Sequence, residues 1–191
     1  MTEQEHELLN RYEESLRKSL TEHLTSLKAL DGRLLEVEEL NEKWRSSAPS
    51  YMADAVPQIN SYPAAAIAWA AYVGMAVAHR WDEDWILYST ESYADLLGPR
   101  GFDDMDEHIV QNILKLKLDS PEATRIEDIM RGLAQTAITT IRHEQVEGQT
   151  TQAFYIFART TRVMFRLGAA MELYRLGYRF EKVNMGAPEP P

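Results

Sequence analysis

The chain has 191 residues, of which 45% are hydrophobic and 26% are charged, and it contains no cysteine. The absence of cysteine excludes disulfides, thiolate zinc sites, iron–sulfur clusters and cysteine nucleophiles. The formal net charge of −10 argues against nonspecific binding to nucleic acid or to an anionic membrane. A chain of this length predicts one domain with a hydrophobic core of its own.

The N-terminal region, residues 1–46, predicts two helices. Leucine and tyrosine recur every three or four residues, which predicts a helix over 2–30 that begins with a capping box of Thr2 and Glu5. An Asp-Gly turn and a second helix over 33–46 then complete an antiparallel hairpin. Because the region lacks the basic and apolar segments of a signal peptide, we expect a cytoplasmic protein.

The most apolar part of the chain is residues 63–78, which follow a loop with three prolines. This run is half alanine and is shorter than the about 20 apolar residues of a membrane-spanning helix, so it predicts a buried core helix starting at Pro63. Its small residues form a ridge at four-residue spacing: Ala66, Ala70, Gly74 and Ala78. The ridge predicts close approach of another helix backbone. Since the helix is apolar on all sides, we expect it at the centre of the fold.

This helix runs into the charged stretch HRWDEDW, residues 79–85. The stretch contains three pairs at i,i+4 spacing: His79 with Glu83, Arg80 with Asp84, and Trp81 with Trp85. We predict that the helix continues through Trp85, that the tryptophans close the core, and that the charged residues pair. Alternatively, a helix that stops near Arg80 leaves three acids where the helix dipole disfavours them by about 0.3–1 kcal/mol each. They then need cations from the last helix or a metal.

Four further helices are expected, over about 90–97, 103–118, 121–147 and 150–176. Strand patterns are absent, so we predict an all-α fold, a bundle of five to seven helices around the alanine-rich helix. The hairpin (1–46) and the main bundle (63–180) are expected to form a single domain over residues 1–185. The proline-rich tail, 186–191, is expected to be disordered.

A metal site is one hypothesis for this chain. The helix near residue 143 carries a second His-x-x-x-Glu pattern, His143 and Glu147, and places Glu144 on its apolar stripe. The candidate ligands, suited to Zn²⁺, Fe²⁺ or Mn²⁺, are His79, Glu83, Asp84 and Glu144. The HExxH zinc motif is absent, and the Glu-x-x-His pattern of di-iron bundles occurs once, near the N-terminus. We therefore predict no cofactor, with a divalent metal as the alternative.

The last predicted helix is rich in arginine. Residues 151–180 contain five arginines and one acid, whereas 82–107 contain nine acids and one base. We expect these two segments to pair, within the chain or across a dimer. The alternative is an anion site, because arginine binds phosphate and carboxylate bidentately. Its candidate residues are Arg159, Arg162 and Arg166, which share one helix face.

No strong catalytic motif occurs, so the leading hypothesis is a non-enzymatic helical interaction or structural module that forms a homodimer. Its third or last helix would supply the interface, because both helices are apolar on more than one face. Two alternatives stay open: a metal-dependent hydrolase or oxidase-like bundle, and a binder of small anions. No nucleic-acid or membrane partner is expected.

Overall fold

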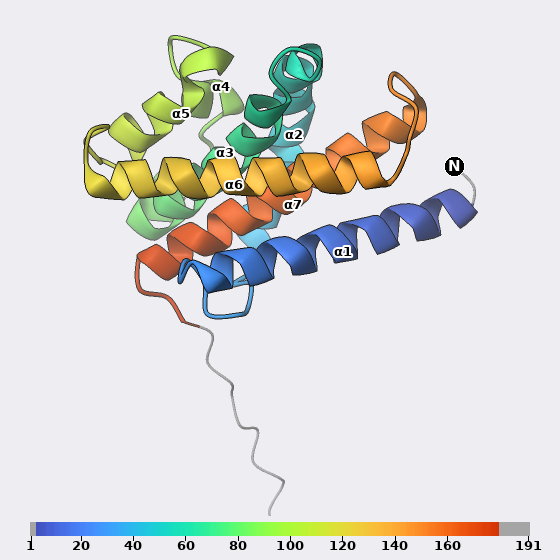
Figure 1. Cartoon of the computed structure of the whole chain (residues 1–191). Coiled ribbons are helices and arrows are strands. Elements are labelled where there is room, and N and C mark those ends of the chain that lie inside the picture. The colour runs from blue at the N-terminus through green and yellow to red at the C-terminus, as the bar shows by residue number, and fades with distance from the viewer. Residues whose placement is uncertain (1–2, 180–191) are drawn as a thin grey trace, which may run out of the picture.

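The computed structural model describes residues 3–179 and is all helical (Figure 1). Helix makes up 77% of the described residues. The principal helices are α1 (Glu3–Ser26), α2 (Glu38–Gln58), α3 (Pro63–Tyr88), α4 (Tyr93–Leu97), α5 (Met105–His108), α6 (Pro121–His143) and α7 (Thr151–Arg175). Within the described residues there is no strand, so the predicted all-α bundle of five to seven helices is confirmed.

Helix α3 lies at the centre of the bundle, as predicted, because every residue from Ala66 to Ala78 except Trp69 is buried. Its main partner is α7, with α2 and α6 also packed against it. Helix α1 lies beside α7 and α6 (Figure 1) rather than against α2. The predicted N-terminal hairpin is therefore wrong: α1 and α2 bury their apolar faces against the α3–α7 pair instead of against each other.

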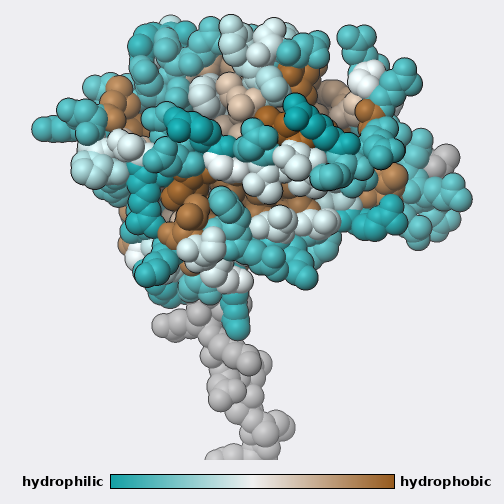
Figure 2. Space-filling model, viewed as in Figure 1, coloured by the Kyte–Doolittle hydropathy of each residue, from teal (hydrophilic) through white to brown (hydrophobic). Residues whose placement is uncertain are grey.

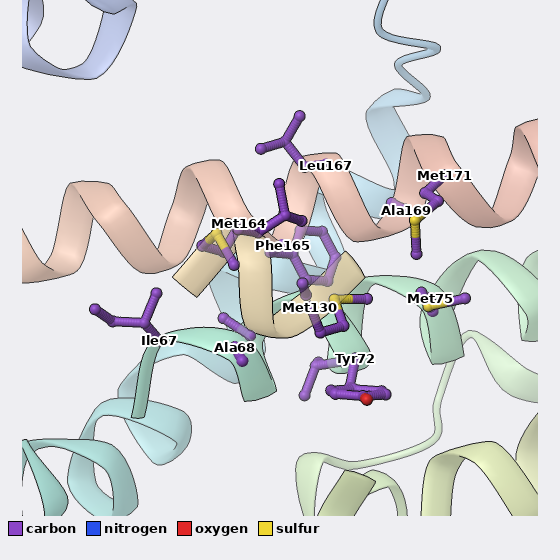
Figure 3. Packing of buried hydrophobic residues seen from close by; sticks show 14 of the residues in the cluster. Ile67, Ala68, Tyr72, Met75, Met130, Met164, Phe165, Leu167, Ala169 and Met171 are labelled. Atoms are coloured by element: carbon purple, nitrogen blue, oxygen red, sulfur yellow. The ribbon is translucent and has the colours of Figure 1, made fainter. Parts of the chain in front are cut away.

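Two glycines allow α3 and α7 to cross at backbone contact. A Cβ atom added to Gly74 would overlap the carbonyl of Phe165 and come within 2.8 Å of the Ala169 amide nitrogen. A Cβ atom added to Gly168 would lie 2.6 Å from the carbonyl carbon of Ala71. The small-residue ridge thus has the role predicted for it. Around the crossing, side chains of α3 and α7 such as those drawn in Figure 3 fill the core.

The boundaries of α2 differ most from the sequence-based expectation. The proline-containing segment after residue 46 was expected to be a loop, yet α2 extends to Gln58 with Pro49 and Pro57 inside it. A proline in a helix interior removes one hydrogen bond and costs about 3 kcal/mol. Burial offsets this cost, because Tyr51 and Ala55 are fully buried in the core.

The segment over 103–118 is likewise not the single helix that the pattern predicts. A 3₁₀ turn (Phe102–Asp104), the short α5 and a π-helical turn (Ile109–Ile113) follow one another before the chain leaves helical conformation. Helix α6 begins as predicted, with the Ser120 side chain accepting a hydrogen bond from the Ala123 amide. The predicted cap at Thr2 and the tail 186–191 lie outside the described residues.

No helix among residues 3–179 combines the length and apolarity needed to cross a membrane. The apolar faces of α3 and α7 are largely explained by their mutual burial. Large apolar side chains of these helices that stay exposed lie at helix ends: Ile86, Leu87, Phe154 and Tyr155. The predicted homodimer and the predicted cytoplasmic location both stay predictions.

Candidate functional site

The HRWDEDW stretch ends one helical segment and begins another. Asp84 has extended backbone angles (φ −167°, ψ 93°) within α3, and its carboxylate accepts a hydrogen bond from the Leu87 amide at 3.1 Å. Asp84 therefore caps a new helical turn, a role for which aspartate is strongly preferred. Helix α3 runs through Trp85 to Tyr88 as predicted, with an interruption at Asp84, but the predicted Arg80–Asp84 pair is wrong. The local bond that aspartate makes to the backbone competes with the regular helix here.

Arg80 is held by the acids on either side of the interruption. It donates to Glu83 at 2.8 Å, its Nε lies 3.5 Å from the Glu91 carboxylate, and its guanidinium stacks over the Tyr88 ring at 4.0 Å. Trp81 and Trp85 are half-buried against the core. The cation that pairs with the acidic part of HRWDEDW is therefore Arg80 of the same helix.

His79 turns toward α7 rather than toward Glu83. Its Nδ1 lies 2.8 Å from Oε1 of Glu172, whose side chain is completely buried. Arg175 donates to both oxygens of Glu172 at 2.7 Å and to Glu122 of α6 at 2.7 Å. Burial alone would raise the pKa of Glu172, but the hydrogen bonds from His79 and Arg175 hold it below its usual value. This His79–Glu172–Arg175–Glu122 network connects α3, α7 and α6.

The four candidate metal ligands do not converge. His79 binds Glu172, Glu83 binds Arg80, and Asp84 caps a turn. Glu144 follows α6 and acts electrostatically on Tyr12, whose hydroxyl bonds Thr160 of α7. Within residues 3–179, no group of three or more His, Asp and Glu side chains has a metal-binding arrangement.

The arginine stripe of α7 faces α1 instead of the acids of 82–107. The nearly buried carboxylate of Glu13 forms ion pairs with all three stripe arginines. These are Arg159, Arg162 with an N–O distance of 3.2 Å, and Arg166 with an N–O distance of 3.8 Å. Arg166 also pairs with Glu36. The expected pairing with the acidic segment is replaced by these ion pairs. An external anion would compete at the stripe with two carboxylates that are already in place.

A separate cavity of about 250 Å³ lies where α1 ends, α6 begins and α7 ends. Its floor consists of five buried apolar side chains: Ala29, Met75, Ile126, Ile129 and Met171. Its rim carries one acid and four bases: Glu122, Lys28, Arg125, Arg175 and Arg179. In Figure 2, apolar side chains line the hollowed seam below α6 on the left, where these three helix ends meet. We call this cavity the basic pocket.

Three of the rim cations have no carboxylate partner among residues 3–179. Arg125 donates only to the backbone carbonyl of Leu27 at 2.8 Å, and Arg179 donates to two backbone carbonyls while stacking on the Tyr174 ring. The Lys28 ammonium makes no hydrogen bond or ion pair with the described residues. Arg175 alone is neutralised, by Glu172 and Glu122. An apolar floor beneath unneutralised cations suits a ligand that is anionic at one end and apolar at the other.

Lys28 holds an unusual backbone conformation at the pocket rim. Its φ of 57° is left-handed, and the Ala29 amide bonds the Leu24 carbonyl at 2.9 Å, so Lys28 terminates α1 in a Schellman motif. Glycine usually occupies this position, because other residues are strained there. Lys28 shares this conformation with Lys115, Gln145 and Gln149, and it alone of these four lines the basic pocket.

Sequence reasoning missed most of the basic pocket. The arginine-rich last helix suggested an anion site, but the hypothesis placed that site at the stripe rather than at Arg175 and Arg179. Lys28 and Arg125 are ordinary charged residues in sequence, on segments that only the fold brings together. A lysine placed two residues past a helix end, where glycine is normal, is the one local clue.

Comparison of the chain with protein-family models, with curated proteins and with solved structures finds no match.

Proposed function

We propose that the protein binds a small amphipathic anion, a carboxylate or phosphate carrying a short apolar group, in the basic pocket. The observation that carries this proposal is the grouping of three unpaired cations around an apolar floor. The grouping occurs in a chain whose formal net charge is −10. The anionic group would bind Lys28, Arg125 and Arg179, and the apolar group would contact Met75, Met171 and their neighbours.

Helix dipoles explain only part of this charge distribution. Lys28 follows the C-terminus of α1 and Arg179 follows that of α7, where cations are favoured by about 0.3–1 kcal/mol. Arg125 lies in the N-terminal part of α6, where the dipole of that helix gives a cation no benefit, but it donates to the Leu27 carbonyl just past the end of α1. None of these contacts neutralises the three cations, which leaves their charges available to an anionic ligand.

The size of the pocket restricts the ligand. At about 250 Å³ it lies below the roughly 300–1,000 Å³ of sites for drug-sized molecules. The apolar part should therefore be a short alkyl chain or a single ring. Hexanoate and phenyl phosphate are suitable probes, with hexanol as the uncharged counterpart of hexanoate.

Arg125→Gln should weaken binding of hexanoate or phenyl phosphate by about tenfold, since a hydrogen bond to a charged group contributes about 1.5–3 kcal/mol. Lys28→Gly should weaken binding similarly while raising the melting temperature, because glycine relieves the left-handed strain at this position. Isothermal titration calorimetry measures the affinity, and thermal denaturation measures the stability.

Arg45→Gln, which removes an exposed arginine on α2, is the matched control and should leave the affinity unchanged. Affinity should fall as salt rises, because ions screen the rim charges. Equal binding of hexanol and hexanoate, or equal losses in Arg45→Gln and Arg125→Gln, would contradict the proposal.

We retain the homodimer as a second proposal, because the end of α3 exposes two adjacent apolar side chains. Ile86 is 92% exposed and Leu87 61% exposed. Apolar side chains this exposed are favoured contacts for another protein surface. We expect a dimer mass by light scattering at micromolar concentration and a monomer mass for Ile86→Asp. Leu118→Asp, at an exposed leucine distant in sequence from α3, should stay dimeric. A monomeric wild-type protein would refute the dimer.

A further inference from the structure

A second cavity lies on another face of α3 and is independent of the basic pocket. It is a groove of about 580 Å³ between the N-terminal half of α3 and α6, with Asp106 of α5 at one end. Aromatic and aliphatic side chains from α3 form one wall, and Met130, Ala134 and Ile138 of α6 form the other. We call it the aromatic groove.

Trp69, which is half-buried, and Tyr72, which is only 2% exposed, line the groove with their rings set at right angles. Their ring centroids are 5.7 Å apart and their planes make an angle of 90°. The Trp69 indole is fixed by a hydrogen bond from its Nε1 to the Phe102 carbonyl at 2.6 Å. Figure 3 shows the Tyr72 ring extending from α3 with its oxygen at the end remote from α7. No hydrogen-bond partner of this hydroxyl occurs within residues 3–179.

Asp106 brings a negative charge to these rings without a cation of its own. No lysine or arginine of the described residues forms an ion pair with its carboxylate, and the nearby Asp104 and Glu107 are acids held by Arg100. Burial raises the pKa of Asp106, with repulsion from these acids adding to it and backbone hydrogen bonds opposing it. Water is thus partly excluded from an acid that makes no direct ion pair, since Arg100 pairs with Asp104 and Glu107 and acts on Asp106 only through space.

We propose that the aromatic groove binds an organic cation, a primary or quaternary ammonium group, at Trp69, Tyr72 and Asp106. The half-buried Trp69 ring presents π-electron density to a cation, and the nearby Asp106 carboxylate supplies the compensating charge. The cation would give Asp106 the direct ion pair that no lysine or arginine of the described residues provides. The Tyr72 oxygen is placed to accept a hydrogen bond from a primary ammonium group.

The two arginines that line the groove do not fill this role. Arg131 is engaged by Glu127 at 2.5 Å and by Asp128 at 3.3 Å on the exposed face of α6. Arg142 lies at the far end of α6, three helical turns from Arg131. Arg131 acts on Tyr72 together with Asp106 and Glu127, so it lies near Asp106, but its guanidinium is engaged by two other acids, and the cation is expected at Asp106.

The test is a titration of the full chain with tetramethylammonium and with butylammonium. The NMR signals of the tryptophan indole N–H groups monitor binding. The Trp69 signal is identified by its loss in Trp69→Phe. We expect saturable shifts of this signal with both cations and no saturable shift with butanol, the neutral counterpart of butylammonium. Asp106→Asn should weaken binding at least about tenfold, as expected for loss of a charged partner.

Glu107→Gln is the matched control, because it removes one negative charge at the adjacent residue, outside the groove lining. It should change the affinity much less than Asp106→Asn. Asp106→Asn should keep or raise the melting temperature, since a neutral side chain is easier to bury, so loss of binding would not reflect unfolding. Equal effects of the two variants, binding of butanol, or no saturable cation binding would each overturn the proposal.

Discussion

Replacing Gly74 by leucine should destabilise the protein by about 3 kcal/mol or more, a large share of the about 5–15 kcal/mol that stabilises a typical domain. The Cβ atom alone would overlap the Phe165 carbonyl and lie 2.8 Å from the Ala169 amide nitrogen. Because these obstacles are backbone atoms of a central helix, they cannot move aside as a flexible side chain can. The helix propensity gained by removing a glycine returns only about 1 kcal/mol. Chemical denaturation followed by circular dichroism measures the change.

Even alanine should be damaging at Gly74, and also at Gly168, where a Cβ would lie 2.6 Å from the Ala71 carbonyl carbon. Gly132→Ala is the matched control, also a helical glycine. A Cβ there would meet only the His23 side chain, at 3.1 Å. This variant should be neutral or more stable by up to about 1 kcal/mol. Similar stability of Gly74→Ala and Gly132→Ala would show that α3 and α7 are not in backbone contact.

Removing the buried carboxylate of Glu172 should cost about 3–5 kcal/mol, the usual effect of breaking a buried ion pair. In Glu172→Ala, His79 and Arg175 both lose their shared partner, and the Arg175 charge is left half-buried. Urea denaturation at neutral pH measures the loss. Glu83→Ala, which breaks the partly exposed pair with Arg80, should cost no more than about 1 kcal/mol.

The same carboxylate should also shape stability at acid pH. Its pKa is lower in the folded state than in the unfolded chain, so its contribution is present above the unfolded value of about 4.3 and is lost as pH falls through the folded value. Unfolding free energy should therefore decrease below about pH 4, and Glu172→Gln should reduce this dependence. An unchanged acid profile in Glu172→Gln would assign the acid sensitivity to other groups.

Much of the helix pattern could be predicted because local periodicity determines it. The four-residue ridge through Gly74 correctly predicted a close helix neighbour, and Ser120 correctly marked the start of α6. Prolines misled the prediction for α2, because burial of Tyr51 outweighed the local penalty at Pro49. Tertiary packing of this kind leaves no local trace in the sequence.

The candidate sites were harder to predict because their residues meet only in the folded chain. His79 has an acid at helical spacing in Glu83, yet it binds Glu172, which lies 93 residues away. Spacing along one helix cannot show which face meets a distant partner. The same limit applies to the basic pocket, since Lys28 and Arg125 belong to segments whose proximity follows from the packing of α1 against α6.

The crossing of α3 and α7 also bears on the order in which the chain acquires structure during synthesis. The apolar surface of α3 has its main partner in a helix that the ribosome makes last among the described elements. Until α7 emerges, α3 carries exposed alanine and aromatic surface that can associate wrongly with other chains. The helices made before α7 therefore cannot complete the hydrophobic core. A nascent chain stalled before α7 should bind chaperones that recognise apolar segments.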